Sequence, residues 1–128
     1  NIADDLVEGL KRFNASDYEG AIKFFRKVVE GFRELLKRDE LIASGLCDKR
    51  RELLTEFLSK AFSLFSNFGE HAGTQGSVDE AKFSKEIVLA VSRYIVSYLT
   101  REEVRKAISE LKGVVTTQKE GTEWVSLL

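Results

Sequence analysis

Residues 16–36 have the sequence SDYEGAIKFFRKVVEGFRELL, which decides the fold of this chain. Apolar side chains recur in it at intervals of three and four residues, and charged side chains fill the positions between them. On an α-helix this spacing places the apolar side chains along one face over about five turns. Ser16 and Glu19 form a Ser-x-x-Glu pattern typical of a helix start, so we predict an amphipathic helix that begins at Ser16. Its apolar face comprises Tyr18, Ala21, Ile22, Phe25, Val28, Val29, Phe32, Leu35 and Leu36.

The segments before and after this stretch have the same period. A short apolar series precedes it and predicts a first helix that ends near Asn14. After a break at residues 39–48, a third helix has a phenylalanine-rich apolar face that continues to Phe68. Because the chain contains no proline, nothing in the sequence forbids helices of this length. The expected core of the bundle consists of Phe25, Val28, Phe32, Phe57, Phe65, Val91 and Ile95.

The same helix-start pattern recurs twice in the second half of the chain. It occurs at Ser77 and at Thr100, each followed three residues later by glutamate, and it predicts the starts of a fourth and a fifth helix. The fourth covers about residues 78–99 and has a wide apolar face, which indicates contact on more than one side. We expect the shorter fifth helix to end at Gly113, because a residue without a side chain suits a left-handed cap.

The last residues of the chain have a different pattern. Residues 114–117 and 122–127 are β-branched, apolar or aromatic, and the turn-forming sequence at residues 119–121 lies between them, which predicts a β-hairpin. The predicted fold class is therefore all-α, with a four- to five-helix antiparallel bundle and a short C-terminal β-hairpin. We expect residues 1–112 to form the bundle. Residues 113–128 are then either the hairpin or the start of a truncated region.

Composition limits the kinds of function that the chain supports. A chain of 128 residues with 43% hydrophobic content is long enough for one core without metals or disulfides. Twenty basic and twenty-one acidic side chains give a net charge of -1, so RNA binding is not indicated by overall charge. Cys47 and His71, the only residues of their types, are too few for a zinc site, and we expect no metal or cofactor. No apolar run approaches the length that spans a bilayer, so we expect a cytoplasmic protein without a membrane partner.

The histidine lies in a glycine-rich segment, residues 69–76, which is expected to connect the third and fourth helices. A neutral imidazole in such a loop can approach a substrate and titrates near physiological pH, so His71 is the candidate catalytic residue. Hydroxyl groups occur nearby at Ser66 and Thr74, but Glu70 beside the histidine does not establish the base and orienting group that a nucleophile requires. The alternative is a loop histidine that donates to a backbone carbonyl and fixes the turn.

The densest basic stretch consists of Lys49, Arg50 and Arg51, and these side chains are candidates for phosphate contacts. Acidic residues interrupt the stretch on both sides, at Asp48 and Glu52. The alternative interpretation is therefore a solvated rim with local ion pairs.

Two motifs accompany this order of helices. The long second helix opens with YEGA at residues 18–21, and residues 67–74, NFGEHAGT, contain a Gly-x-His-x-Gly loop. The following helix opens with DEA at residues 79–81. Over about the first hundred residues this series resembles the HEPN superfamily of helical-bundle domains, particularly those of archaeal and bacterial proteins. The resemblance implies a helical bundle that forms a homodimer.

Within the loop, the resemblance assigns the motif positions Asn67, Gly69, Glu70 and Gly73 around a catalytic His71. In HEPN ribonucleases an arginine precedes the histidine by four to six intervening residues, and the two side chains act together across a dimer to cleave RNA. In this sequence the three positions of that window hold Leu64, Phe65 and Ser66.

Two hypotheses follow. The first is a non-catalytic helical interaction or dimerisation module, with a second copy or another protein as its partner, within a larger defence- or toxin-related protein. The second is a metal-independent HEPN-type ribonuclease in which His71 works with an arginine of a second protomer, such as Arg93 or Arg51, and RNA is then the partner. A small ligand-binding helical domain is a third alternative, and it requires a pocket.

Overall fold

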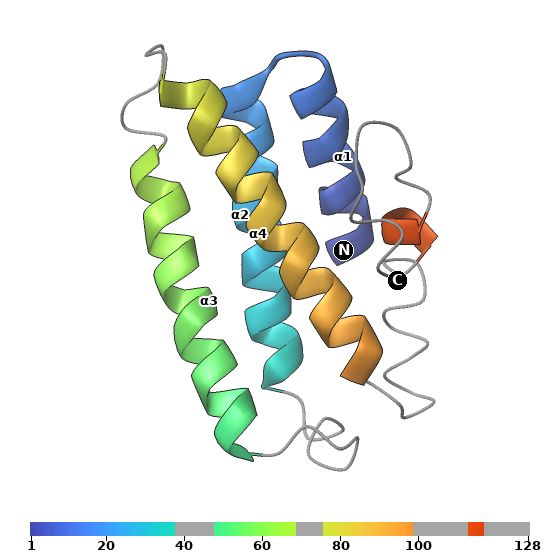
Figure 1. Ribbon diagram of the computed structural model, residues 1–128, viewed down its shortest axis with the longest axis vertical. Helices are drawn as coiled ribbons and strands as arrows, with labels where there is room; N and C mark the ends of the chain where they lie inside the picture. The colour runs from blue at the N-terminus through green and yellow to red at the C-terminus, as the bar shows by residue number, and fades with distance from the viewer. Residues whose placement is uncertain (38–47, 69–75, 99–112, 117–128) are drawn as a thin grey trace.

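The computed structural model describes residues 1–37, 48–68, 76–98 and 113–116, and these residues are all helical or in short connections between helices. Successive helices run in opposite directions, as Figure 1 shows. The all-helical, antiparallel bundle predicted from the sequence is therefore confirmed for this part of the chain. Its long helices are α1 (Ile2–Asn14), α2 (Tyr18–Leu36), α3 (Asp48–Phe68) and α4 (Gly76–Tyr98).

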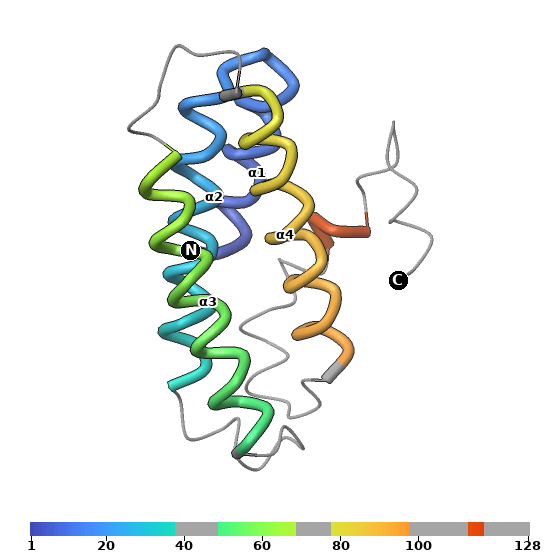
Figure 2. Tube along the Cα trace, turned by 60° about the vertical axis from the view of Figure 1, so that its left-hand side comes forward, coloured from blue at the N-terminus to red at the C-terminus, as the bar shows by residue number. Residues whose placement is uncertain are grey.

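The second helix is the centre of the bundle. It packs against α1, α3 and α4, whereas α3 and α4 make few contacts with each other and α1 makes few with α4. In Figure 1 α3 and α4 lie on either side of the lower part of α2, and Figure 2 shows the lower end of α4 apart from α2. The apolar face predicted for residues 18–36 supplies this packing, because all its members except the half-buried Tyr18 are buried. This stretch supplies more buried side chains to the core than any other described helix.

A glycine allows α1 to lie close to α2. A side chain at Gly9 would place its Cβ atom 2.6 Å from the ring of Phe25, which is closer than Cβ atoms are found in proteins. The ring of Phe25 therefore packs directly against the backbone of α1 and is fully buried. Buried apolar area of this kind is the main source of stability in a bundle of this size.

The connection between α1 and α2 differs from the prediction at its helix start. Asp17, and not Ser16, is the N-cap of α2: the carboxylate of Asp17 accepts a hydrogen bond of 3.0 Å from the backbone amide of Gly20. Ser16 has a φ of 62°, a left-handed conformation that closes the turn from α1. The backbone amide of Asp17 donates to the carbonyl of Arg12 at 2.8 Å. Ser16 therefore belongs to the turn, and α2 begins after it. Both residues are good N-caps, and the short connection selects the second one.

We expect Asp17→Ala to lower the free energy of unfolding by about 1 kcal/mol at neutral pH, because α2 loses its cap. The hydrogen bond from Gly20 and the ion pair with Arg12 lower the pKa of Asp17 below its ordinary value. A lowered pKa in the folded protein means that this contribution is present above the unfolded pKa, about 3.9, and is lost as pH falls through the folded value. Urea unfolding at neutral and acid pH measures it, with Ser16→Ala as the matched control. An equal loss for Ser16→Ala at neutral pH would show that the cap is misassigned.

The predicted core is correct at six of its seven positions and wrong at Phe57. Phe57 is 45% exposed, whereas Leu58, the next residue, is fully buried. Among the described helices α3 packs mainly on α2, and its buried side chains are Leu58, Ala61 and Phe65. A residue one position away points about 100° around the helix. The apolar period therefore predicted the helix correctly, but only part of the apolar face of α3 is buried. The six buried positions are Phe25, Val28, Phe32, Phe65, Val91 and Ile95.

The C-terminal prediction is contradicted where it can be compared. Residues 113–116 are helical, although we expected a helix to end at Gly113 and a strand to begin at Val114. Val115 is fully buried in the core, and Thr116 donates to the carbonyl of Gly113 at 3.1 Å. Burial of a β-branched side chain in the core here outweighs its preference for a strand. The rest of the expected fifth helix and hairpin lies outside the described residues.

Candidate functional site

The histidine loop predicted as the catalytic site lies outside the described residues. This applies to His71 and to the motif positions Gly69, Glu70 and Gly73. The fourth motif position, Asn67, is exposed in the last turn of α3. The described residues on either side of this segment are the end of α3 at Phe68 and the start of α4 at Gly76.

The two arginines named as candidate partners of the histidine lie far along their helices from these ends. Arg51 is in the first turn of α3, seventeen residues before Phe68, and Arg93 is seventeen residues after Gly76 on α4. At 1.5 Å per residue each separation is about 26 Å. A partnership within one protomer would have to cross that distance, so the ribonuclease hypothesis depends on the arginine of a second protomer.

The three candidate phosphate-binding residues are in the first turn of α3. Lys49 and Arg50 are exposed, and Arg51 is half-buried with its backbone carbonyl accepting from the hydroxyl of Thr55 at 2.7 Å. Positive side chains at a helix start are unfavourable for the helix dipole, so they do not serve to stabilise α3. They form an accessible basic cluster, with the exposed carboxylate of Glu52 beside it.

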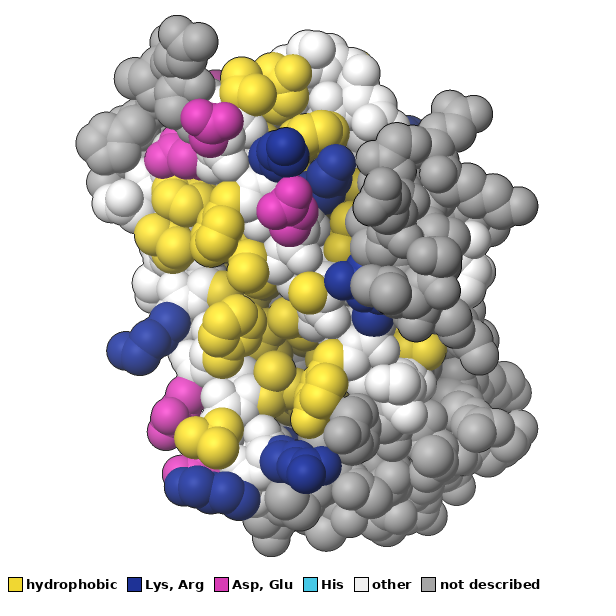
Figure 3. All heavy atoms as spheres, viewed as in Figure 1, with side chains coloured by type: hydrophobic (Ala, Val, Ile, Leu, Met, Phe, Trp, Pro, Cys, Tyr) yellow, Lys and Arg dark blue, Asp and Glu magenta, His cyan; other side chains and the backbone are white. Residues whose placement is uncertain are grey.

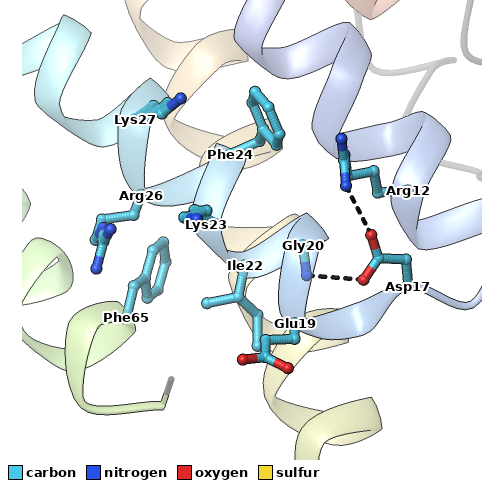
Figure 4. Close-up of a pocket in the computed structure, with 10 residues that line it drawn as sticks. All are labelled: Arg12, Asp17, Glu19, Gly20, Ile22, Lys23, Phe24, Arg26, Lys27 and Phe65. Atoms are coloured by element: carbon cyan, nitrogen blue, oxygen red, sulfur yellow. Dashed lines mark hydrogen bonds and ion pairs between the residues drawn. The ribbon is translucent and has the colours of Figure 1, made fainter. Parts of the chain in front are cut away.

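A hollow of about 460 Å³ lies mainly on α2, and the sequence did not predict it (Figure 4). Four cations line it, but Arg12 is already paired with Asp17 at 2.9 Å and with Glu8 at 3.2 Å. These hydrogen bonds raise the pKa of Arg12. In Figure 4 the remaining basic side chains point in different directions along α2, and Arg26 extends towards the helix that carries Phe65. Basic side chains line the edge of the hollow, but they do not point to one place where they could hold a single anion together.

The second unpredicted feature is a set of exposed apolar side chains on α3 and α4. Leu53 is 50% exposed, Leu64 is 41% exposed and Phe83 is 43% exposed, and Phe57 has been described above. Figure 3 shows hydrophobic side chains gathered over α3 and the neighbouring part of α4. We call the set Leu53, Phe57, Leu64 and Phe83 the α3–α4 face. It lies where the two helices make few contacts with each other.

Aromatic contacts connect this face to the core. The ring of Phe68 packs edge-on against Phe83, with ring centroids 6.2 Å apart, and stacks on Phe65 at 6.0 Å. Phe65 is buried and Phe68 is half-buried, so aromatic rings join the exposed Phe83 to the core. Large apolar side chains grouped in this way are typical of interaction sites and not of the solvated surface of a monomer.

Within the described part of the chain, no three His, Cys, Asp or Glu side chains are grouped so that they could hold a metal ion. None of the helices in that part combines the length and the apolar content needed to cross a membrane. A scan of family models, a search of curated proteins and a search of solved structures each found no match to this chain.

Proposed function

We propose that this chain is a non-catalytic, HEPN-like helical interaction module that forms a homodimer through the α3–α4 face. The observation that supports the proposal is the exposure of Leu53, Phe57, Leu64 and Phe83 on adjoining helices. Removing apolar surface from water contributes about 25 cal/mol per Å², and a second copy offers the same apolar surface in return. A net charge of -1 also gives two copies little mutual repulsion at long range.

The residues in the expected arginine window support the non-catalytic part of the proposal. Leu64 belongs to the α3–α4 face, Phe65 is buried in the core, and the hydroxyl of Ser66 donates to the carbonyl of Phe62 at 2.9 Å. None of these three side chains brings a positive charge to the end of α3. A positive charge stabilises a phosphoryl transition state, and this window supplies none, which favours binding over cleavage.

The test of dimerisation is the mass of the full chain in solution, measured by sedimentation over a wide concentration range. We expect a dimer for the wild type and at least about tenfold weaker association for Phe57→Glu, which places two charges in a buried apolar interface. Val78→Glu is the matched control, because Val78 is 42% exposed but lies on a different side of α4 from Phe83, which belongs to the α3–α4 face. A monomeric wild type, or equal weakening by both variants, contradicts the proposal.

The non-catalytic assignment has a separate test. We expect purified protein to leave single-stranded and structured RNA intact in the absence of divalent metal, and His71→Ala to make no difference. Cleavage that His71→Ala abolishes would overturn this assignment and establish the ribonuclease hypothesis. Retained dimerisation would still leave the interaction surface in place, so the two results are independent.

A further inference from the structure

The outward side of α3 has a regular repeat of exposed side chains. Six of its positions follow one another at alternating intervals of three and four residues, and all six side chains are exposed. This is the a/d spacing of a coiled coil, in which each helix inserts its side chains between those of a partner helix. We call these six positions the α3 seam: Arg50, Leu53, Phe57, Lys60, Leu64 and Asn67.

The repeat is symmetric about a point between Leu58 and Ser59. Position 50 lies as far before that point as position 67 lies after it, and the same holds for Leu53 with Leu64 and for Phe57 with Lys60. Two copies of α3 that cross in opposite directions over this point therefore bring leucine against leucine at two places. A two-fold symmetric dimer requires a surface that is complementary to itself in this way.

Resting on the proposed homodimer, we infer that its two copies of α3 pair antiparallel, with Leu53 of each chain against Leu64 of the partner subunit. A parallel pairing would place Arg50 against Arg50 of the partner subunit and Lys60 against Lys60 of the partner subunit. Like charges that face each other in an interface weaken the association, and the antiparallel pairing avoids both of these contacts.

Charges beside the seam also favour the antiparallel pairing. Glu56 and Lys60 are both exposed, and neither forms an ion pair in the described part of the chain. The antiparallel pairing brings Lys60 against Phe57 of the partner subunit and next to Glu56 of the partner subunit. A lysine over a phenylalanine ring already occurs within the bundle, where the Nζ atom of Lys85 is 4.2 Å from the ring centre of Phe13. The central layer of the seam thus combines a cation–π contact with an ion pair, twice by symmetry.

Crosslinking between two differently tagged chains tests the direction of pairing. In a Cys47→Ser background, one chain carries Leu53→Cys and the other Leu64→Cys, and a bis-maleimide linker much shorter than 16 Å joins cysteines that face each other. In the antiparallel pairing two copies of residue 53 are eleven positions apart, about 16 Å along the helix. We expect mixed 53–64 crosslinks to exceed 53–53 and 64–64 crosslinks by about tenfold.

Each outcome has a distinct meaning. Dominant 53–53 and 64–64 crosslinks indicate a parallel seam, which overturns the inference and leaves the proposed dimer through the α3–α4 face in place. A sedimentation dimer without crosslinks indicates another surface, which overturns both the inference and the proposed α3–α4 interface and leaves only dimerisation. A monomeric full chain overturns the inference and the proposed function together.

A charge exchange provides a second test that does not depend on cysteine. We expect Lys60→Glu to weaken dimerisation by about tenfold, because two added carboxylates meet Glu56 of the partner subunit. The double variant Glu56→Lys and Lys60→Glu restores the pairing in an antiparallel seam and is expected to dimerise about as well as the wild type. If the double variant remains as weak as Lys60→Glu, the inferred register is wrong. Circular dichroism confirms that each variant, altered only at exposed positions, keeps its fold.

Discussion

Phe25→Ala is expected to lower the free energy of unfolding by about 3–5 kcal/mol, the largest loss that we predict for a single side chain. The ring of Phe25 is fully buried between α1 and α2, where the backbone at Gly9 packs against it. Its removal leaves a cavity that the two helices cannot fill without separating from the core. A domain of this size is stable by about 5–15 kcal/mol, so this variant loses a large fraction of its stability. Urea unfolding followed by circular dichroism measures the loss.

The neighbouring phenylalanine is the control for this variant. Phe24 is half-buried, and its ring lies between two cations, with the Nζ atom of Lys27 at 4.6 Å and the guanidinium carbon of Arg12 at 5.1 Å. Each exposed cation–π contact contributes about 0.5–1 kcal/mol, so Phe24→Ala is expected to cost much less than Phe25→Ala. Equal losses at the two positions would mean that α1 does not pack on α2 as described.

The sequence predicted the helices well because their period is set by local geometry. Residues 18–36 have one apolar face, and every large aliphatic side chain on it is buried. The helix start was misplaced by one residue because Ser16 and Asp17 are both good caps, and the three-residue connection decides between them. At residues 114–116 local β-propensity was misleading, since the burial of Val115 depends on helices that are distant in sequence. Local patterns therefore predicted the elements, and tertiary contacts set their ends.

The apolar surface was harder to predict than the fold. The period of apolar residues along a helix predicts which residues share a face. It does not predict whether another helix covers that face. The pattern therefore placed Phe57 in the core together with Phe65. The structure separates the two because, among the described helices, only α2 packs closely on α3. The available signal was a second apolar series on α3, at Leu53, Phe57 and Leu64, in addition to the series that packs on α2.

The adjacent residues Leu58 and Phe57 separate stability from association. Leu58 is fully buried, and Leu58→Ala is expected to lower the free energy of unfolding by about 2–5 kcal/mol. Phe57→Ala removes a larger side chain, but much of its ring is exposed, so we expect the separated monomer to lose less than about 1 kcal/mol. Size alone predicts the opposite order, which makes the pair a direct test of how α3 is oriented.

Concentration distinguishes the two effects in a single experiment. Because only the folded chain dimerises, the unfolding midpoint of the wild type is expected to rise with protein concentration. Leu58→Ala should keep this dependence at a lower midpoint, since the outward face of α3 is unchanged. Phe57→Ala should lose most of the dependence and, at high dilution, unfold close to the wild type. If Leu58→Ala removes the dependence and Phe57→Ala keeps it, the outward and inward sides of α3 have been exchanged, and the proposed interface fails with them.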